Sequence, residues 1–264
     1  MGHGAGSGKI HRGARTLIAN AAMSLTERVE EIEAYIAVAC LRAGRPRAEV
    51  EFMAVSKTCP ASVIIEAAQL GIKLFGENRV QEFAAKDAGL AALREGDEPL
   101  IRVHLIGHLQ TNKAARAVEL FDGIDSVDSL RLAERLNEAA TRLNKTLPIL
   151  IEVKLSTEET KAGLDPTSAE AADLLELLPG LSALSLRGLM TIAPFDVSEE
   201  ETRACFRNLR QWRERWAAAH PRLSFDVLSM GMSGDFALAI EEGATGIRVG
   251  TALFGERKAS PEPA

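Results

Sequence analysis

Residues 225–255 read FDVLSMGMSGDFALAIEEGATGIRVGTALFG. In this stretch an apolar run leads into a loop of glycine and serine, a helical stretch follows, and a second apolar run ends at Gly250 and Thr251. A strand, a helix and a second strand in this order place the two strands parallel, because the helix carries the chain back to the edge where the first strand began.

The same alternation extends toward the amino terminus and predicts an α/β protein with eight strands. The predicted strands are Phe52–Ser56, Ile72–Phe75, Val103–Ile106, Gly123–Ser126, Ile149–Val153, Leu186–Met190, Phe225–Leu228 and Gly246–Val249. The predicted helices between them are Ala61–Leu70, Arg79–Ala88, Asn112–Phe121, Ser129–Asn144, Pro166–Leu178, Glu199–Ala219 and Asp235–Glu242. Eight parallel strands with intervening helices indicate a single (β/α)8 TIM barrel, a fold of about 250 residues.

An extra helix is predicted before the first strand. Leu25, Val29, Ile32 and Ile36 recur at helical spacing, and Ser24 can cap the helix start. Residues 1–22 differ in composition, being rich in Gly, Ala and Arg. We expect them to form a disordered extension or to precede a true start at Met23, with an organellar transit peptide as the alternative. The predicted barrel domain spans residues 23–258, and residues 259–264 form a disordered tail.

Composition restricts the function classes. Of the 264 residues, 46% are hydrophobic and 26% charged, with a net charge of −6, which is typical of a globular domain and argues against a nucleic-acid partner. Charges interrupt every apolar run, so we expect no membrane span. The three cysteines are far apart and lack CxxC spacing, which argues against a disulfide framework or a zinc site and favours a reducing cytoplasm.

The loops after strands seven and eight predict a phosphate site. TIM barrels hold their ligands at the carboxyl-terminal ends of the strands and often bind phosphate at these two loops. Here the loops offer backbone N–H groups and hydroxyls from Ser229, Gly231, Ser233, Gly234, Gly250 and Thr251. Each loop alone is better explained by turn and cap residues. Together, at these positions, they favour a phosphate.

Two lysines are candidates for Schiff-base chemistry. Lys57 directly follows the first strand, and Lys154 follows the fifth, so both belong at the barrel mouth, where partial desolvation frees an amine for nucleophilic attack. Sequence position alone does not decide between them. Lys113 and Lys161 are interpreted as surface residues.

Arg248 precedes the predicted phosphate loop and is a candidate ligand contact. An arginine facing a pyridine nitrogen cannot accept its proton, so the ring stays unprotonated and is a weaker electron sink than one paired with a carboxylate. The alternative is a salt bridge inside the barrel. His104 and His108 lie four residues apart on an extended segment, which does not place both rings on one metal ion, so no metal site is expected.

Several ordered motifs resemble the pyridoxal phosphate homeostasis protein (YggS-like) family. They are AVSKT at 54–58, FGENRVQE at 75–82, HLIGHLQTNK at 104–113, LRGLM at 186–190, LSMGMSGD at 228–235 and IRVGTALFG at 247–255. The resemblance runs from about Ser24 to Arg257.

The resemblance implies a barrel related to the amino-terminal domain of alanine racemase, with pyridoxal 5'-phosphate (PLP) held as a Schiff base on Lys57. It also implies roles for the other candidate residues. Arg248 would face the pyridine nitrogen and Asn78 would lie near the cofactor, while the phosphate would be held by Ser229, Gly231, Ser233, Gly250 and Thr251. Family members are regarded as carriers or regulators of PLP without established turnover, and PLP-dependent apoenzymes are candidate partners.

No catalytic residue is predicted. Racemases of this fold use a tyrosine from outside the barrel as a second base, whereas this chain has one tyrosine, Tyr35, in the first helix, and no second domain. The missing domain also favours a monomer. Two alternatives stay open: an aldolase-type enzyme in which Lys57 or Lys154 attacks a phosphorylated substrate, and a weak amino-acid racemase.

Overall fold

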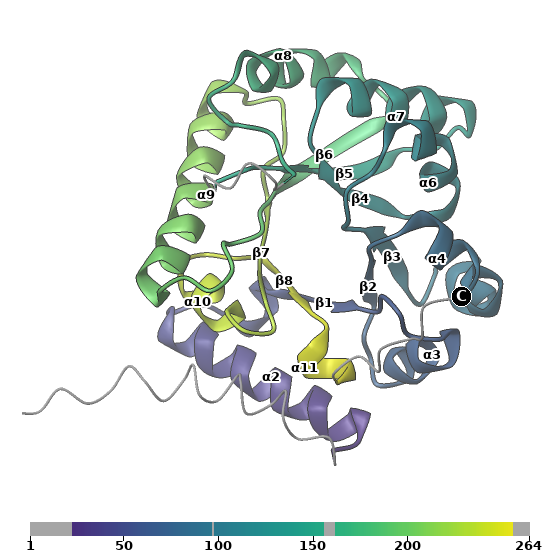
Figure 1. Ribbon diagram of the computed structural model, residues 1–264, viewed down its shortest axis with the longest axis vertical. Helices are drawn as coiled ribbons and strands as arrows, with labels where there is room; N and C mark the ends of the chain where they lie inside the picture. The colour runs from purple at the N-terminus through teal and green to yellow at the C-terminus, as the bar shows by residue number, and fades with distance from the viewer. Residues whose placement is uncertain (1–22, 97, 156–161, 256–264) are drawn as a thin grey trace, which may run out of the picture.

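The computed structural model describes residues 23–96, 98–155 and 162–255. Its eight strands form a closed barrel in chain order, each parallel to its neighbours, with β8 pairing back to β1. Figure 1 shows them as an inner ring surrounded by helices. The predicted TIM barrel is therefore confirmed. The strands are β1 (Glu51–Val55), β2 (Leu74–Glu77), β3 (Arg102–Leu105), β4 (Gly123–Val127), β5 (Leu147–Glu152), β6 (Leu184–Met190), β7 (Val227–Met232) and β8 (Gly246–Val249).

The outer layer consists mainly of helices that follow the strands. They are α3 (Ala61–Gln69), α4 (Val80–Ala84), α5 (Ala91–Arg94), α6 (Ala114–Leu120), α7 (Leu130–Arg142), α8 (Ala169–Leu177), α9 (Glu199–Ala219), α10 (Phe236–Glu241) and α11 (Thr251–Phe254). Short 3-10 turns lie at Arg47–Glu49, Asp87–Leu90, Thr111–Lys113 and Leu178–Gly180. Within the described residues, no helix is long and apolar enough to cross a membrane.

The extra amino-terminal helix is α2 (Leu25–Arg42), which begins at a capping box formed by Ser24 and Glu27. It packs on α10 and α11, and the Arg28 guanidinium donates a hydrogen bond to the carbonyl of Leu253 at 3.3 Å. Since α11 has only four residues, α2 completes the outer layer beside β8 (Figure 1).

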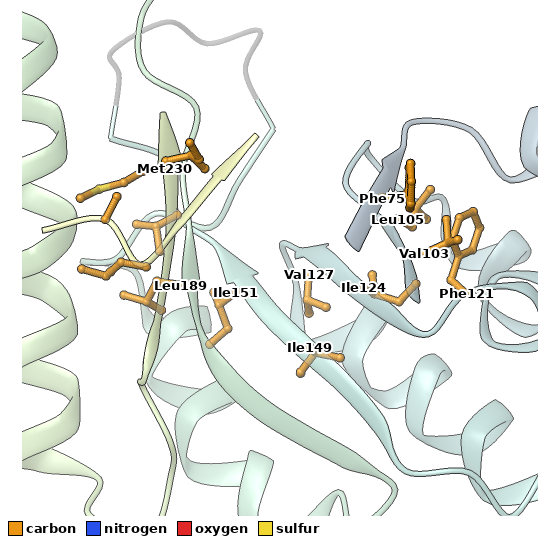
Figure 2. Close-up of a cluster of buried hydrophobic side chains, with 14 of the residues drawn as sticks. Phe75, Val103, Leu105, Phe121, Ile124, Val127, Ile149, Ile151, Leu189 and Met230 are labelled. Carbon is orange, nitrogen blue, oxygen red and sulfur yellow. The ribbon is translucent and has the colours of Figure 1, made fainter. Parts of the chain in front are cut away.

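The core fills the space between the strands and the helices. Every residue of β4 is buried, as expected for a parallel strand covered on both faces. Figure 2 shows apolar side chains from several strands, among them Phe75, Leu105 and Ile149, in this layer. Trp216 is buried, and Trp212, one helical turn before it on α9, packs against the same core.

Most predicted boundaries differ from the observed ones by one to three residues, and three differences are larger or have a clear cause. The segment Arg79–Ala88 is not one helix, because α4 ends at Ala84 and a 3-10 turn follows from Asp87. Strand β2 begins at Leu74, because its pairing with β1 and β3 starts there, although Ile72 is also buried. Strand β7 continues to Met232, beyond the predicted end at Leu228, because Met230 is buried in the core like a strand residue.

Some predictions concern other parts of the chain. The extension or shifted start at residues 1–22, the tail at 259–264 and the surface position of Lys161 lie outside the described residues. The last three residues of the predicted 23–258 domain also lie outside them.

Candidate functional site

The predicted site residues lie at or near the ends of four consecutive strands. The closed order places β7, β8, β1 and β2 side by side. Lys57 follows β1, Asn78 follows β2, and Thr251 follows β8. Gly250 lies beside the first strand, since a Cβ added there would lie 3.4 Å from Val55 Cβ. The fold therefore brings the predicted lysine and the predicted phosphate loops to one side of the barrel mouth.

The strand order also places the two candidate lysines on different sides of the barrel. Lys154 follows β5, which stands four strands away from β1 in the ring of eight. Its backbone N–H donates to the carbonyl of Leu164 at 3.0 Å. Lys154 thus leaves the barrel on the side away from Gly250, whereas Lys57 leaves it on the adjacent strand.

The turn that carries Lys57 is held by a lysine that the sequence did not reveal as important. Lys86 Nζ donates to the carbonyls of Ser56 and Cys59, both at 3.1 Å. The backbone N–H of Thr58, which has a positive φ of 66°, donates to the Glu82 carboxylate. Bonds on both sides of Lys57 therefore fix the backbone of this turn.

Behind the turn lies a buried acid, Glu77. Its Oε1 accepts a hydrogen bond from Ser56 Oγ at 2.6 Å and forms an ion pair with Lys86 Nζ at 2.8 Å. Burial raises the pKa of Glu77, although the hydrogen bonds from Lys86 and Ser56 act to lower it. Among the described residues, Glu77 Oε2 has no hydrogen-bond partner. No signal in the sequence identified this ion pair, because Lys86 reads as an ordinary polar position of a helix.

Ser233 joins the loops after β7 and β8. Its hydroxyl accepts hydrogen bonds from the backbone N–H groups of Gly250 and Ala252, both at 3.3 Å. Ser233 is buried, and Thr251 is exposed. These bonds bring a hydroxyl and the start of α11 together at the barrel mouth, in the kind of loop cluster that holds a phosphate in other barrels.

Gly231 has a packing role in this loop. It has a φ of +92°, and a Cβ there would lie 2.5 Å from Ala239 Cβ and 2.9 Å from Phe236 Cα. Only glycine tolerates both the backbone conformation and the close approach of α10. Gly231 therefore sets the path of the chain toward Ser233.

Arg248 is buried in the barrel beside Ser229. Its guanidinium donates to Ser229 Oγ at 2.7 Å and to the carbonyl of Thr191 at 2.8 Å. Burial lowers the pKa of Arg248, while nearby Asp125, Asp235 and Glu152 act to raise it. An arginine stays protonated even so. Ser229 lies within β7, so its hydroxyl meets Arg248, whereas that of Ser233 meets Gly250.

Asn78 follows β2 and is half-buried. The loop after β3 passes directly over its backbone, since a Cβ on Gly107 would lie 2.3 Å from the Asn78 carbonyl oxygen. Within the described residues, the Asn78 side chain has no hydrogen bond, so its amide is available to a ligand.

An acidic group lies at the ends of β4 and β5. Glu152 is 5% exposed, and burial together with the Asp128 charge raises its pKa to about 7, against the opposing charges of Arg248 and His108. Asp128 Oδ2 lies 3.0 Å from His108 Nδ1. The described residues contain no group of three metal-ligating side chains close enough to hold an ion.

Comparisons with known proteins agree with this architecture. The family model described as alanine racemase, N-terminal domain, matches residues 30–258. The pyridoxal phosphate homeostasis protein of Aquifex aeolicus is 41% identical over 236 residues, which cover 89% of this chain and 100% of the relative. The protein of the same name from Vibrio cholerae is 40% identical over 235 residues, covering 89% and 97%.

Two solved structures extend the comparison. PipY of Synechococcus elongatus, with PLP bound, is 44% identical, covers 88% of this chain and 100% of its own, and has a TM-score of 0.73. Alanine racemase of Clostridium difficile is 16% identical, covers 89% of this chain and 57% of its own, and has a TM-score of 0.66, which shows a shared fold alone. With a family match over most of its length and relatives near 40% identity, this chain belongs to the pyridoxal phosphate homeostasis protein family, within the alanine racemase N-terminal domain fold.

Proposed function

We propose that this chain binds PLP covalently through Lys57 and takes part in PLP homeostasis, without turnover of its own. The observation that carries the proposal is that β7, β8 and β1 are adjacent in the barrel. This order puts Lys57, Arg248 and the loop bonds of Ser233 on one side of the barrel. The PLP-bound relative PipY, 44% identical over 88% of this chain, supports it.

The groups at this end of the barrel fit the phosphate and the aldehyde of PLP. Its phosphate requires N–H and hydroxyl donors, which Ser233, Gly250 and Thr251 would provide, with Gly231 shaping the loop. Its aldehyde requires an amine, and Lys57 stands on a turn that Lys86 and Glu82 hold in place. Asn78, with an available amide, would contact the cofactor from β2. Ser229 completes the sequence-derived set, and we assign it a positioning role, because its hydroxyl is engaged by Arg248.

Arg248 would face the pyridine nitrogen. When bound, PLP supplies an electron-withdrawing ring that stabilises negative charge next to its imine, most strongly when the ring nitrogen is protonated. A guanidinium cannot accept that proton. Held by Ser229 and Thr191, Arg248 would therefore keep the ring in its less reactive form, which favours a carrier or regulator over an enzyme.

A second candidate function rests on Glu152. This buried carboxyl has a pKa of about 7 and lies near Arg248, so it can hold or release a proton near neutral pH. The tyrosine Tyr35 instead packs in α2 against the core. Slow deuterium exchange at the α-carbon of an amino acid, lost in Glu152→Gln, would support weak racemase activity. Absence of exchange in the unaltered protein would exclude it.

The visible absorption spectrum of the purified protein tests the cofactor and its lysine. We expect an absorption band that borohydride abolishes, that Lys57→Ala lacks and that the matched Lys154→Ala variant retains. A protein that stays colourless after PLP is added would contradict the proposal. Loss of the band in Lys154→Ala alone would assign the cofactor to the other side of the barrel and revive the aldolase-type alternative.

We further propose that the chain acts as a monomer in the cytoplasm, with PLP-dependent apoenzymes as recipients of the cofactor. Sedimentation of the PLP-loaded protein and transfer of PLP to an apoenzyme across a dialysis membrane test these two points. Transfer that requires direct contact would show delivery rather than release into solution.

A further inference from the structure

A cavity opens at the opposite end of the barrel from the proposed PLP site. It encloses about 200 Å³. Glu51 and Arg102 line it at the starts of β1 and β3, and the polar residues further along the strands are His104, Asp125, Arg187 and Ser229. TIM-barrel interiors are ordinarily filled by layers of branched apolar side chains, so a cavity with charged side chains in its lining departs from the packing of the fold.

The deep wall of this cavity contains an ion-paired histidine. His104 Nδ1 lies 2.9 Å from Asp125 Oδ1, and Asp125 is 3% exposed. Burial acts to lower the pKa of His104, but the charge and hydrogen bond of Asp125 outweigh it and raise the pKa above its ordinary value. The imidazole and the carboxylate therefore offset each other's charge.

The rim carries two arginines from different sides of the barrel. Arg102, on β3, pairs with Glu51 at 2.6 Å, and both side chains are about half exposed, at 51% and 50%. Arg187, on β6, is exposed and has neither a hydrogen bond nor an ion pair to any described residue. An exposed pair contributes at most about 1 kcal/mol, so Arg102 can exchange its partner for a ligand at little cost. The rim thus has an excess of positive charge.

We propose that this cavity binds a small dicarboxylate anion, with one carboxylate on Arg187 and the other reaching Arg102. Guanidinium groups are the natural partners of carboxylates because their donors match both oxygens. The cavity is smaller than the roughly 300–1,000 Å³ of pockets for drug-sized molecules. This size suits a small acid of about four carbons.

Ser229 connects this cavity to Arg248. Its hydroxyl accepts a hydrogen bond from Arg248 at 2.7 Å, and the residue also lines the cavity. An anion bound in the cavity therefore alters the surroundings of the Ser229 hydroxyl, which holds the Arg248 guanidinium. This coupling rests on the proposed function, because it requires that Arg248 contact the PLP ring. Anion binding in the cavity does not depend on that function.

Calorimetric titration of the purified protein with sodium succinate tests the site. We expect saturable binding to the unaltered protein, no binding of the neutral analogue succinamide, and an affinity at least about tenfold lower in Arg187→Gln. Arg187→Lys keeps the charge and restores part of the loss. Arg131→Gln is the matched control, because Arg131 is exposed on α7 and has no ion pair to a described residue.

Equal succinate affinity in Arg187→Gln and the unaltered protein, or no saturable binding at all, would overturn the proposal. The coupling is read separately, as a succinate-dependent shift of the PLP absorption band that Arg187→Gln lacks. Binding without this shift would overturn the coupling alone. A colourless protein that binds succinate would keep the cavity site and contradict the proposed PLP site.

Discussion

The two ends of this barrel are built from different parts of the chain. At the carboxyl-terminal end, the candidate site is formed by loops: Ser233 joins two backbone N–H groups, and Lys86 holds the turn that carries Lys57. At the amino-terminal end, the cavity is lined by side chains of the strands themselves, such as Arg187 and His104. The loop end is fixed largely by buried and partly buried bonds, whereas the rim of the strand end consists of exposed charges. The same fold can therefore hold one ligand rigidly and leave another surface open to exchange.

Removing the buried cation at the loop end should have the largest effect. In Lys86→Met, Glu77 stays buried without its ion-pair partner, so we expect a loss of about 3–5 kcal/mol in the free energy of unfolding. Urea unfolding measures it, and PLP affinity should fall as well, because the Lys57 turn loses two hydrogen bonds. Arg135→Gln, which breaks an exposed pair with Glu138, is the control. Similar losses of unfolding free energy in Lys86→Met and Arg135→Gln would contradict the claim that the buried ion pair contributes more than the exposed one.

The pH dependence of stability should expose the buried acid Glu152. Its pKa is about 7 in the folded protein and 4.5 as the unperturbed value, so the folded state holds the proton more tightly. Stability from this group is present below pH 4.5 and is lost as the pH rises through 7, by about 3 kcal/mol. Glu152→Gln should lack this contribution. The measurement is urea unfolding of both proteins from pH 4.5 to 8, and parallel pH profiles would contradict the prediction.

The Ser233 hydroxyl should have an intermediate effect. Ser233→Ala leaves the N–H groups of Gly250 and Ala252 without their acceptor, which should cost about 1–3 kcal/mol of stability and weaken PLP binding. Absorbance titration with PLP and urea unfolding measure the two effects. Ser62→Ala, at an exposed position of α3, should change neither. Ser229→Ala sharpens the comparison, because it should shift the PLP absorption band while weakening phosphate binding less than Ser233→Ala does.

The smallest effect is expected at the rim of the amino-terminal cavity. Glu51→Gln breaks the half-exposed pair with Arg102, and stability should fall by less than about 1 kcal/mol. Succinate affinity should rise, because the Glu51 carboxylate no longer offsets the charge of the Arg102 guanidinium. A loss of unfolding free energy near that of Lys86→Met would show that the Glu51–Arg102 pair stabilises the fold as much as the buried Glu77–Lys86 pair does.

The sequence predicted the loop end better than the strand end for a physical reason. Glycine and serine after a strand mark loops in the sequence, and the eightfold alternation fixes which loops are neighbours. The pattern therefore predicted that Lys57, Ser233 and Gly250 lie at one mouth of the barrel, which is where the strand order places them. The boundaries failed where tertiary packing decides, as at Met230, whose burial extends β7.

The residues that sequence reasoning missed depend on register. The Glu77–Lys86 pair joins the end of β2 to the turn after α4, and the cavity joins residues from all eight strands. Side chains in a barrel meet according to the stagger between strands, which no local pattern reveals. His104 was weighed as a metal ligand, and its partner Asp125 became visible only in the structure.

The most direct test of the central claim is to identify the lysine that carries PLP. The protein is loaded with PLP, reduced with borohydride and digested, and the modified peptide is sequenced by mass spectrometry. Modification of Lys57 is the predicted result, with Lys154 and Lys86 unmodified. Modification of Lys154, or of many lysines to similar low extents, would contradict a site built where β7, β8 and β1 meet.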